Sequence, residues 1–208
     1  MKLVILLLII FFLIINFTKE KFNNLKTKEN LKVIVIGNGK YEKKNMGTII
    51  DNYDLVIRFN KFPEKNYEEH IGTKTNIWFV SDFTYTSNKK LINQRKNKIK
   101  TKIIISPYVF KEKLSLIEDP EFKKILEKRE IKIPTKYNFG KRWPSTGLLA
   151  LFYLIPKYND ITIFGFNSFD PKDKSIHFYD NAKPIGHSSN LEKQIIDDLL
   201  NSKKIKRL

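Results

Sequence analysis

The chain has 208 residues, with 39 lysines and arginines against 22 aspartates and glutamates, and a formal net charge of +17. It contains no cysteine, which excludes disulfide bonds, zinc sites with thiolate ligands and a cysteine nucleophile. A hydrophobic fraction of 41% can fill one ordinary core, so we expect a single domain. The positive charge would suit an acidic ligand or nucleic acid. Because the lysines are spread along the chain without an interleaved aromatic motif, we favour a lysine-rich coding bias and expect no nucleic-acid partner.

An apolar run opens the chain. Residues 3–15 are apolar without interruption, and Phe17 extends the run past Asn16. The run is shorter than the roughly 17–25 residues of most spanning helices, and no small residues mark a cleavage site after it. We predict a transmembrane signal-anchor at residues 1–17, with a cleaved signal peptide or a membrane-surface helix as alternatives. The polar, lysine-rich residues 18–30 predict a short stem before a globular domain at 31–208.

Strands and helices alternate along the rest of the chain. Short runs rich in β-branched and aromatic residues predict strands at 31–39, 54–60, 75–81, 102–110 and 160–170. Helical patterns occupy 44–53, 115–130, 144–156 and 188–205, and the third of these is the strongest. Such alternation is typical of an α/β domain with a mostly parallel central sheet.

A glycine-rich turn ends the first predicted strand. Gly37 and Gly39 permit close backbone approach, and Asn38 can donate and accept hydrogen bonds. In doubly wound sheets, ligands bind beyond the carboxyl ends of the strands. The pattern is not GxGxxG, so the sequence leaves both a nucleotide-binding loop and an ordinary tight turn open.

The helix predicted at 144–156 begins with Ser145, Thr146 and Gly147. Free backbone N–H groups at a helix start can bind an anion, and the two hydroxyls add donors. An ordinary helix cap is the alternative.

Two histidines, His177 and His187, lie ten positions apart near the C-terminus, with acids at Asp180 and Glu192. Their spacing matches no strong metal motif, and the chain contains neither HExxH, DxD nor GxSxG. Acid–base chemistry remains, because histidine titrates near neutral pH. Two loop histidines without a function are the alternative.

Four segments in order resemble the sialylmotifs of glycosyltransferase family 29, the sialyltransferases. Residues 33–79 resemble the large motif, and residues 144–166 resemble the small motif. The segment HFYD from His177 resembles motif III, and His187 with Glu192 resembles the very small motif. Together the motifs cover nearly all of the expected globular domain.

The resemblance implies a Rossmann-like variant GT-A fold and an inverting, metal-independent glycosyl transfer from a CMP-sugar donor to a glycan acceptor. Sialic acid is the implied donor sugar, and Kdo is the alternative, as is an inactive nucleotide- or glycan-binding relative. It implies that His187 is the general base and that His177 binds the leaving phosphate. The residues implied to bind the donor are Asn38, Asn60, Ser145, Thr146 and Gly147, with Gly37, Gly39 and Glu192 in support.

The resemblance also implies a location. Members of this type are single-pass membrane proteins with a lumenal catalytic domain, in the Golgi of a eukaryotic host, and a cleaved N-terminal segment would make the protein secreted. Animal members usually join the large and small motifs by a disulfide, whereas the aligned positions here are Val33 and Tyr158. We expect these two side chains to pack in the core instead.

Overall fold

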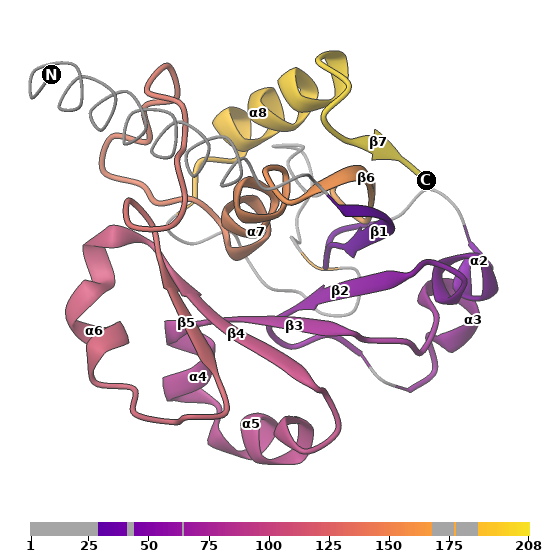
Figure 1. The fold of residues 1–208 in the computed structure, drawn as a ribbon, viewed down its shortest axis with the longest axis horizontal. Helices are drawn as coiled ribbons and strands as arrows, with labels where there is room; N and C mark the ends of the chain where they lie inside the picture. Colours follow the sequence, from indigo (N-terminus) through magenta and orange to yellow (C-terminus); the bar gives the residue numbers. More distant parts are fainter. Residues whose placement is uncertain (1–28, 41–43, 64, 168–176, 178–186) are drawn as a thin grey trace, which may run out of the picture.

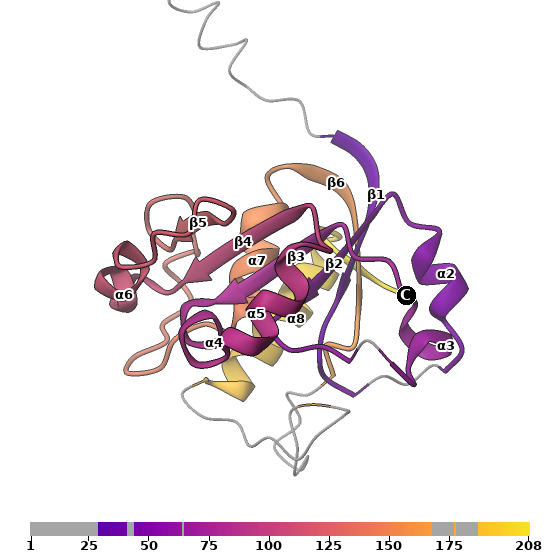
Figure 2. The ribbon, with the colours of Figure 1, turned by 90° about the horizontal axis from the view of Figure 1, so that it is seen from below.

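A computed structural model of the protein describes residues 29–40, 44–63, 65–167, 177 and 187–208. These residues form a seven-stranded sheet with the order β5-β4-β3-β2-β1-β6-β7, shown in two views in Figures 1 and 2. All neighbouring strands run parallel, which confirms the predicted parallel sheet. The strands are β1 (Glu29–Ile36), β2 (Leu55–Phe59), β3 (Ile77–Ser81), β4 (Thr101–Ser106), β5 (Lys123–Leu126), β6 (Tyr158–Phe164) and β7 (Lys206–Arg207).

The sheet is doubly wound around β1. The chain adds β2 to β5 on one side of β1 and then returns to place β6 on the other side. Val33 to Ile36 are buried on both faces, which explains why β1 is a continuous apolar run. The point where the strand order reverses, between β1 and β6, is where such sheets bind their ligands.

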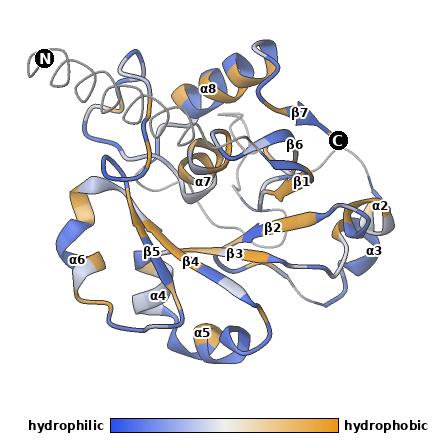
Figure 3. Cartoon of the chain, in the orientation of Figure 1, coloured by the Kyte–Doolittle hydropathy of each residue, from blue (hydrophilic) through white to orange (hydrophobic). Residues whose placement is uncertain are grey.

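Helices cover both faces of the sheet (Figure 1). Phe79 of β3 packs in the core cluster shared with α7 and α8, whereas its neighbours Trp78 and Val80 pack on the other face with α4 and α5. Every residue of α7 from Leu148 to Leu154 is buried, and the apolar colouring of α7 and the inner strands is visible in Figure 3. The helices are α2 (Gly47–Asp51), α3 (Glu68–Ile71), α4 (Asp82–Ser87), α5 (Lys89–Lys96), η1 (Tyr108–Phe110), α6 (Lys111–Ser115), α7 (Thr146–Leu154) and α8 (Ser189–Asn201).

The prediction of a helix at 115–130 is wrong. Residues 123–126 form the edge strand β5, which pairs with β4 and buries Ile125 and Leu126. Isolated apolar residues at mixed spacing fit either a helix or a half-buried strand. The open edge of β4 decides between them, because pairing there satisfies backbone groups and buries two aliphatic side chains together.

The sequence reading also missed several short elements. Helices α3 to α6 have four to eight residues each and therefore carry little periodicity of their own, and β7 has two residues. Val33 and Tyr158 both contact the core cluster beneath α7, as expected.

The signal-anchor predicted at 1–17 lies outside the described residues. Of the predicted stem, the structure describes Glu29 and Asn30, and both belong to β1. Among the described helices, none is long and apolar enough to span a lipid bilayer.

Candidate active site

An open pocket with a cavity volume of about 150 Å³ lies at the carboxyl ends of β1, β2 and β6. It brings together all but one of the residues predicted from the sequence, and Glu192 lies directly behind its wall. The lining residues are Gly37, Asn38, Gly39, Phe59, Asn60, Ser145, Thr146, Gly147, Gly165, Phe166, His177, His187 and Ser189.

The floor of the pocket is formed where the turns after β1 and β6 meet. The N–H of Gly39 donates to the carbonyl of Gly165 at 2.9 Å, and a Cβ at Gly37 would lie 2.3 Å from that same carbonyl oxygen. Gly165 has a φ of +72°, a conformation that side chains rarely adopt. The two turns therefore touch through backbone atoms, which only glycine at position 37 permits.

Asn38 uses its side-chain N–H groups within the protein. They donate to the carbonyls of Phe59 at 3.4 Å and Lys61 at 3.3 Å, and so hold the loop after β2. The group that Asn38 leaves for a ligand is its amide oxygen, an acceptor suited to a hydroxyl or amino donor.

Asn60 links the loop after β2 to the start of α7. Its amide oxygen accepts from the N–H of Ser81 at 2.8 Å, and its side-chain nitrogen donates to the hydroxyl oxygen of Thr146 at 3.3 Å. Because that hydroxyl oxygen already accepts a hydrogen bond, the Thr146 hydroxyl proton can point toward a ligand.

Ser145 caps α7, as its sequence position suggested. Its hydroxyl oxygen accepts from the N–H of Leu148 at 3.2 Å. Both of its own donors point away from the pocket: its N–H bonds Glu192 Oε1 at 2.8 Å, and its hydroxyl bonds Glu192 Oε2 at 2.5 Å. Ser145 was predicted to hold the donor directly, but the structure commits its donors to Glu192. Thr146 and Gly147 are left to present donors at the helix start.

Glu192, in α8, is completely buried. Burial raises the pKa of its carboxyl to about 7, although the hydrogen bonds from Ser145 oppose the change. Its Oε1 lies 4.0 Å from Nδ1 of His187. Glu192 was predicted to support the site, and its contacts show that it fixes Ser145 at the start of α7.

His187 is oriented by a backbone group. Its Nδ1 lies 3.0 Å from the carbonyl oxygen of Trp143, whose ring meets the imidazole edge-on at 6.2 Å. A carbonyl oxygen only accepts, so Nδ1 carries the proton and Nε2 keeps a lone pair. Burial lowers the pKa of His187, and Arg142 adds to this, while the bond to Trp143 opposes it. A neutral imidazole with a free Nε2 is the form that a general base requires.

His177 also lines the pocket, so the two predicted histidines come together. The remaining residues of motif III, including Asp180, lie outside the described residues. Within the described ranges, no group of three or more His, Cys, Asp or Glu side chains is arranged to hold a metal ion.

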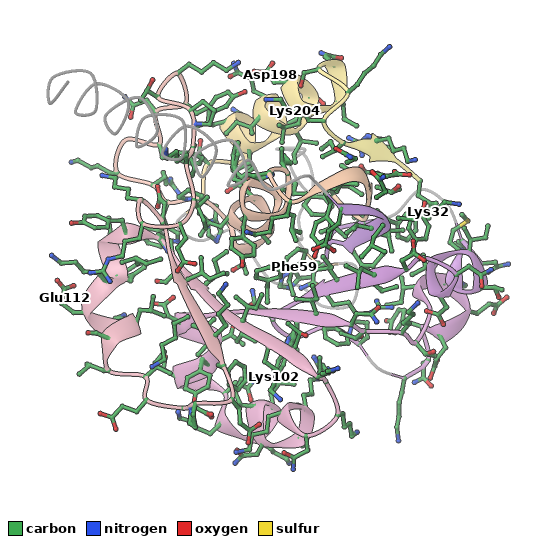
Figure 4. The ribbon with its side chains drawn as sticks, viewed as in Figure 1. Lys32, Phe59, Lys102, Glu112, Asp198 and Lys204 are labelled. Atoms are coloured by element: carbon green, nitrogen blue, oxygen red, sulfur yellow. The ribbon has the colours of Figure 1, made fainter. Side chains whose placement is uncertain are left out.

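Four pocket residues were not singled out from the sequence: Phe59, Gly165, Phe166 and Ser189. Phe59 and Phe166 meet edge-to-face at 6.3 Å and close the pocket beneath Gly147, and Figure 4 shows Phe59 in the middle of the molecule. Position was the available signal for Phe59 and Ser189, which lie at the end of the strand predicted at 54–60 and at the start of the helix predicted at 188–205. Gly165 and Phe166 lie within the strand predicted at 160–170, and only the end of β6 at Phe164 places them in the turn that follows.

The fold and the pocket define a Rossmann-like α/β protein that gathers a helix start, two asparagines and two histidines around one pocket. The profile of glycosyltransferase family 29 (sialyltransferase) matches residues 9–118 and 108–204. The chain belongs to glycosyltransferase family 29.

Individual relatives agree with this assignment. The chain is 27% identical over 200 residues to the chicken CMP-N-acetylneuraminate-beta-galactosamide-alpha-2,3-sialyltransferase 1, across 83% of the chain and 56% of the relative. It is 26% identical over 155 residues to sialyltransferase-like protein 2 of Arabidopsis thaliana, across 74% of the chain and 34% of the relative. The chain thus spans about half, or less, of the length of these relatives.

Solved structures show the same fold. A crystal structure of a mammalian sialyltransferase matches with a TM-score of 0.56 at 21% identity, across 86% of this chain and 69% of that chain. The complex of a mammalian sialyltransferase with Gal-beta-1-3GalNAc-ortho-nitrophenol matches with a TM-score of 0.58 at 20% identity, with the same coverage of both chains.

Proposed function

We propose that the protein transfers sialic acid from CMP-sialic acid to a hydroxyl of a glycan acceptor, with inversion and without a metal ion. The observation that carries this proposal is the geometry of His187. Its Nδ1–H donates to the carbonyl of Trp143, which leaves the lone pair of Nε2 available on a side chain that lines the pocket. The family and the named activities of the relatives support the choice of substrates.

The donor would be bound by complementary groups. The amide oxygen of Asn38 suits hydroxyl or amino groups of the nucleotide. The hydroxyl of Thr146 and the N–H groups at the start of α7 suit its phosphate or the sugar carboxylate, because the helix dipole favours negative charge there. The described lining contains neither lysine nor arginine, so neutral donors and the histidines would bind the anion.

The reaction follows as a single displacement. Nε2 of His187 takes the proton of the acceptor hydroxyl, whose oxygen bonds to the anomeric carbon. The bond from that carbon to the phosphate oxygen breaks, and its electron pair leaves with CMP. His177, on the same pocket, would donate to the departing phosphate. A positioned base contributes about 10²–10⁴-fold in rate, and fixed donors to a developing anion contribute comparably.

A transfer assay tests this function. Purified full chain is supplied with CMP-sialic acid or CMP-Kdo and a panel of β-galactosides, including Gal-beta-1-3GalNAc, and release of CMP is followed with and without acceptor. We expect acceptor-dependent CMP release with CMP-sialic acid. Release from CMP-Kdo alone would identify the alternative donor, and binding of CMP without release from either donor would indicate an inactive relative.

We also propose that residues 1–17 anchor the protein in a membrane, with the catalytic domain on the lumenal side. The uninterrupted apolar run at 3–15 supports this. Retention of the full chain in the membrane pellet after alkaline carbonate extraction is expected, and release into the supernatant would refute anchoring.

A further inference from the structure

The backbone of Asn60 adopts an uncommon conformation that other groups must hold. Its φ of +43° lies in the left-handed region, which is unfavourable for L-residues. Asparagine tolerates this region better than most residues. The conformation turns the chain sharply after β2 and aims the side chain at Thr146.

Two side chains donate hydrogen bonds to the carbonyl oxygen of Asn60 from the face of the sheet opposite α7. The indole N–H of Trp78 donates to it at 2.8 Å, and Nη1 of Arg95 donates to it at 3.3 Å. Nη2 of Arg95 donates to the carbonyl of Phe62 at 2.5 Å, so this guanidinium spans the loop after β2. Trp78 is on β3 and Arg95 on α5, and neither lines the pocket.

The side chains of Trp78 and Arg95 are held in place by their packing. Trp78 is fully buried and Arg95 is only 5% exposed. The guanidinium of Arg95 lies 4.0 Å from the centre of the Phe62 ring and 5.8 Å from that of Trp78, so both rings fix its position. Hydrogen bonds from charged groups are stronger than those between neutral groups, so the bond from Arg95 helps to offset the cost of the left-handed backbone.

The hydrogen bonds to the Asn60 carbonyl affect the pocket because they fix the direction of the Asn60 side chain. With the backbone fixed, its amide oxygen meets the N–H of Ser81 and its amide nitrogen meets Thr146. If the carbonyl were released, the left-handed conformation would relax and rotate the amide away from both partners. The Thr146 hydroxyl would then lose the donor that directs its own proton toward the pocket.

We propose that Trp78 and Arg95 are positioning residues for the nucleotide site, acting through Asn60 from the far side of the sheet. The expected effect on CMP binding rests on the proposed function. The positioning of Asn60 does not, because its orientation can be measured without a ligand. Substitutions on the α5 face would therefore alter donor affinity although they touch no ligand.

The test compares Trp78→Phe with Tyr53→Phe. The first keeps an aromatic ring but removes the N–H that donates to Asn60. The second removes a hydrogen bond of similar kind, from the Tyr53 hydroxyl to Thr162, in a different part of the core. Amide hydrogen exchange of Ser81 reports the Asn60 orientation, and calorimetric titration with CMP reports the site.

We expect Trp78→Phe to speed exchange at Ser81 and to weaken CMP binding about five-fold, the loss of one neutral hydrogen bond, while Tyr53→Phe changes neither. Arg95→Met should weaken binding at least about ten-fold. Unchanged Ser81 exchange in Trp78→Phe would overturn the positioning role even if Arg95→Met does not fold. Equal losses of CMP affinity in Trp78→Phe and Tyr53→Phe would also overturn it, since they would reflect general destabilisation. If the parent protein does not bind CMP, but Ser81 exchanges faster in Trp78→Phe than in the parent, the proposed function is refuted and the positioning of Asn60 stands.

Discussion

Replacement of Glu192 by glutamine should change how the stability of the protein depends on pH. Glu192 is completely buried, and in the folded protein its pKa is raised from an ordinary value of 4.5 to about 7 by burial. Between these two values the folded protein holds a proton that the unfolded chain releases. Stability therefore falls as pH rises through this window, and the loss is complete above about pH 7.

The size of the effect follows from the same two values. At about 1.4 kcal/mol for each pH unit, the full loss is about 3 kcal/mol, of which roughly 2 to 3 kcal/mol falls between pH 5 and pH 8. Glutamine has nearly the same shape, can still accept from the N–H of Ser145, and does not ionise. The free energy of unfolding of Glu192→Gln minus that of the parent protein should therefore increase by about 2 to 3 kcal/mol as the pH rises from 5 to 8.

Urea unfolding at pH 5, 6, 7 and 8 measures the difference. His187, whose pKa burial lowers, contributes the opposite sign, since its stabilisation is lost as pH falls. Both proteins carry His187, so its contribution largely cancels. Glu112→Gln is the matched control, because it makes the same change at a side chain that projects into solvent, as Figure 4 shows, whereas the gain expected of Glu192→Gln comes from burial. A difference between Glu192→Gln and the parent that stays within about 1 kcal/mol over this range would refute the reasoning.

Further predictions concern the reaction and the pocket floor. His187→Ala should abolish transfer while CMP binding, by calorimetry, stays nearly intact, because the base acts on the acceptor; lost CMP binding would contradict its role. His177→Ala should weaken both CMP binding and turnover, and unchanged turnover would rule out contact with the leaving phosphate. Excess chelator should leave initial transfer rates unchanged, whereas strong inhibition restored by a divalent cation would contradict a metal-independent reaction. Gly37→Ala would place a Cβ 2.3 Å from the carbonyl oxygen of Gly165, so we expect the free energy of unfolding, measured in urea, to fall by about 1–3 kcal/mol. Equal stability of Gly37→Ala and the parent would show that the two turns can separate without cost.

Much of the site was accessible from the sequence because its parts lie at the ends of regular elements. The apolar runs before Gly37 and after Gly147 predict a strand and a helix by themselves, and a parallel sheet brings their ends to one edge. The ordered motifs then connected these ends with His177 and His187. The strand at 123–126 was misjudged because its side chains fit two periodicities, and only the free edge of β4 distinguishes them.

The strong elements, the parallel sheet and the family could be predicted from the chain alone, because periodicity and the order of motifs can be recognised without a structure. What each polar group does depends on contacts that form only when the chain folds. The fold directs both donors of Ser145 to Glu192, 47 positions away, and sets the carbonyl of Asn60 against Arg95. Hydrogen bonds consume donors and acceptors one at a time, so a residue's capacity to bind a ligand depends on which distant groups the fold has already placed against it.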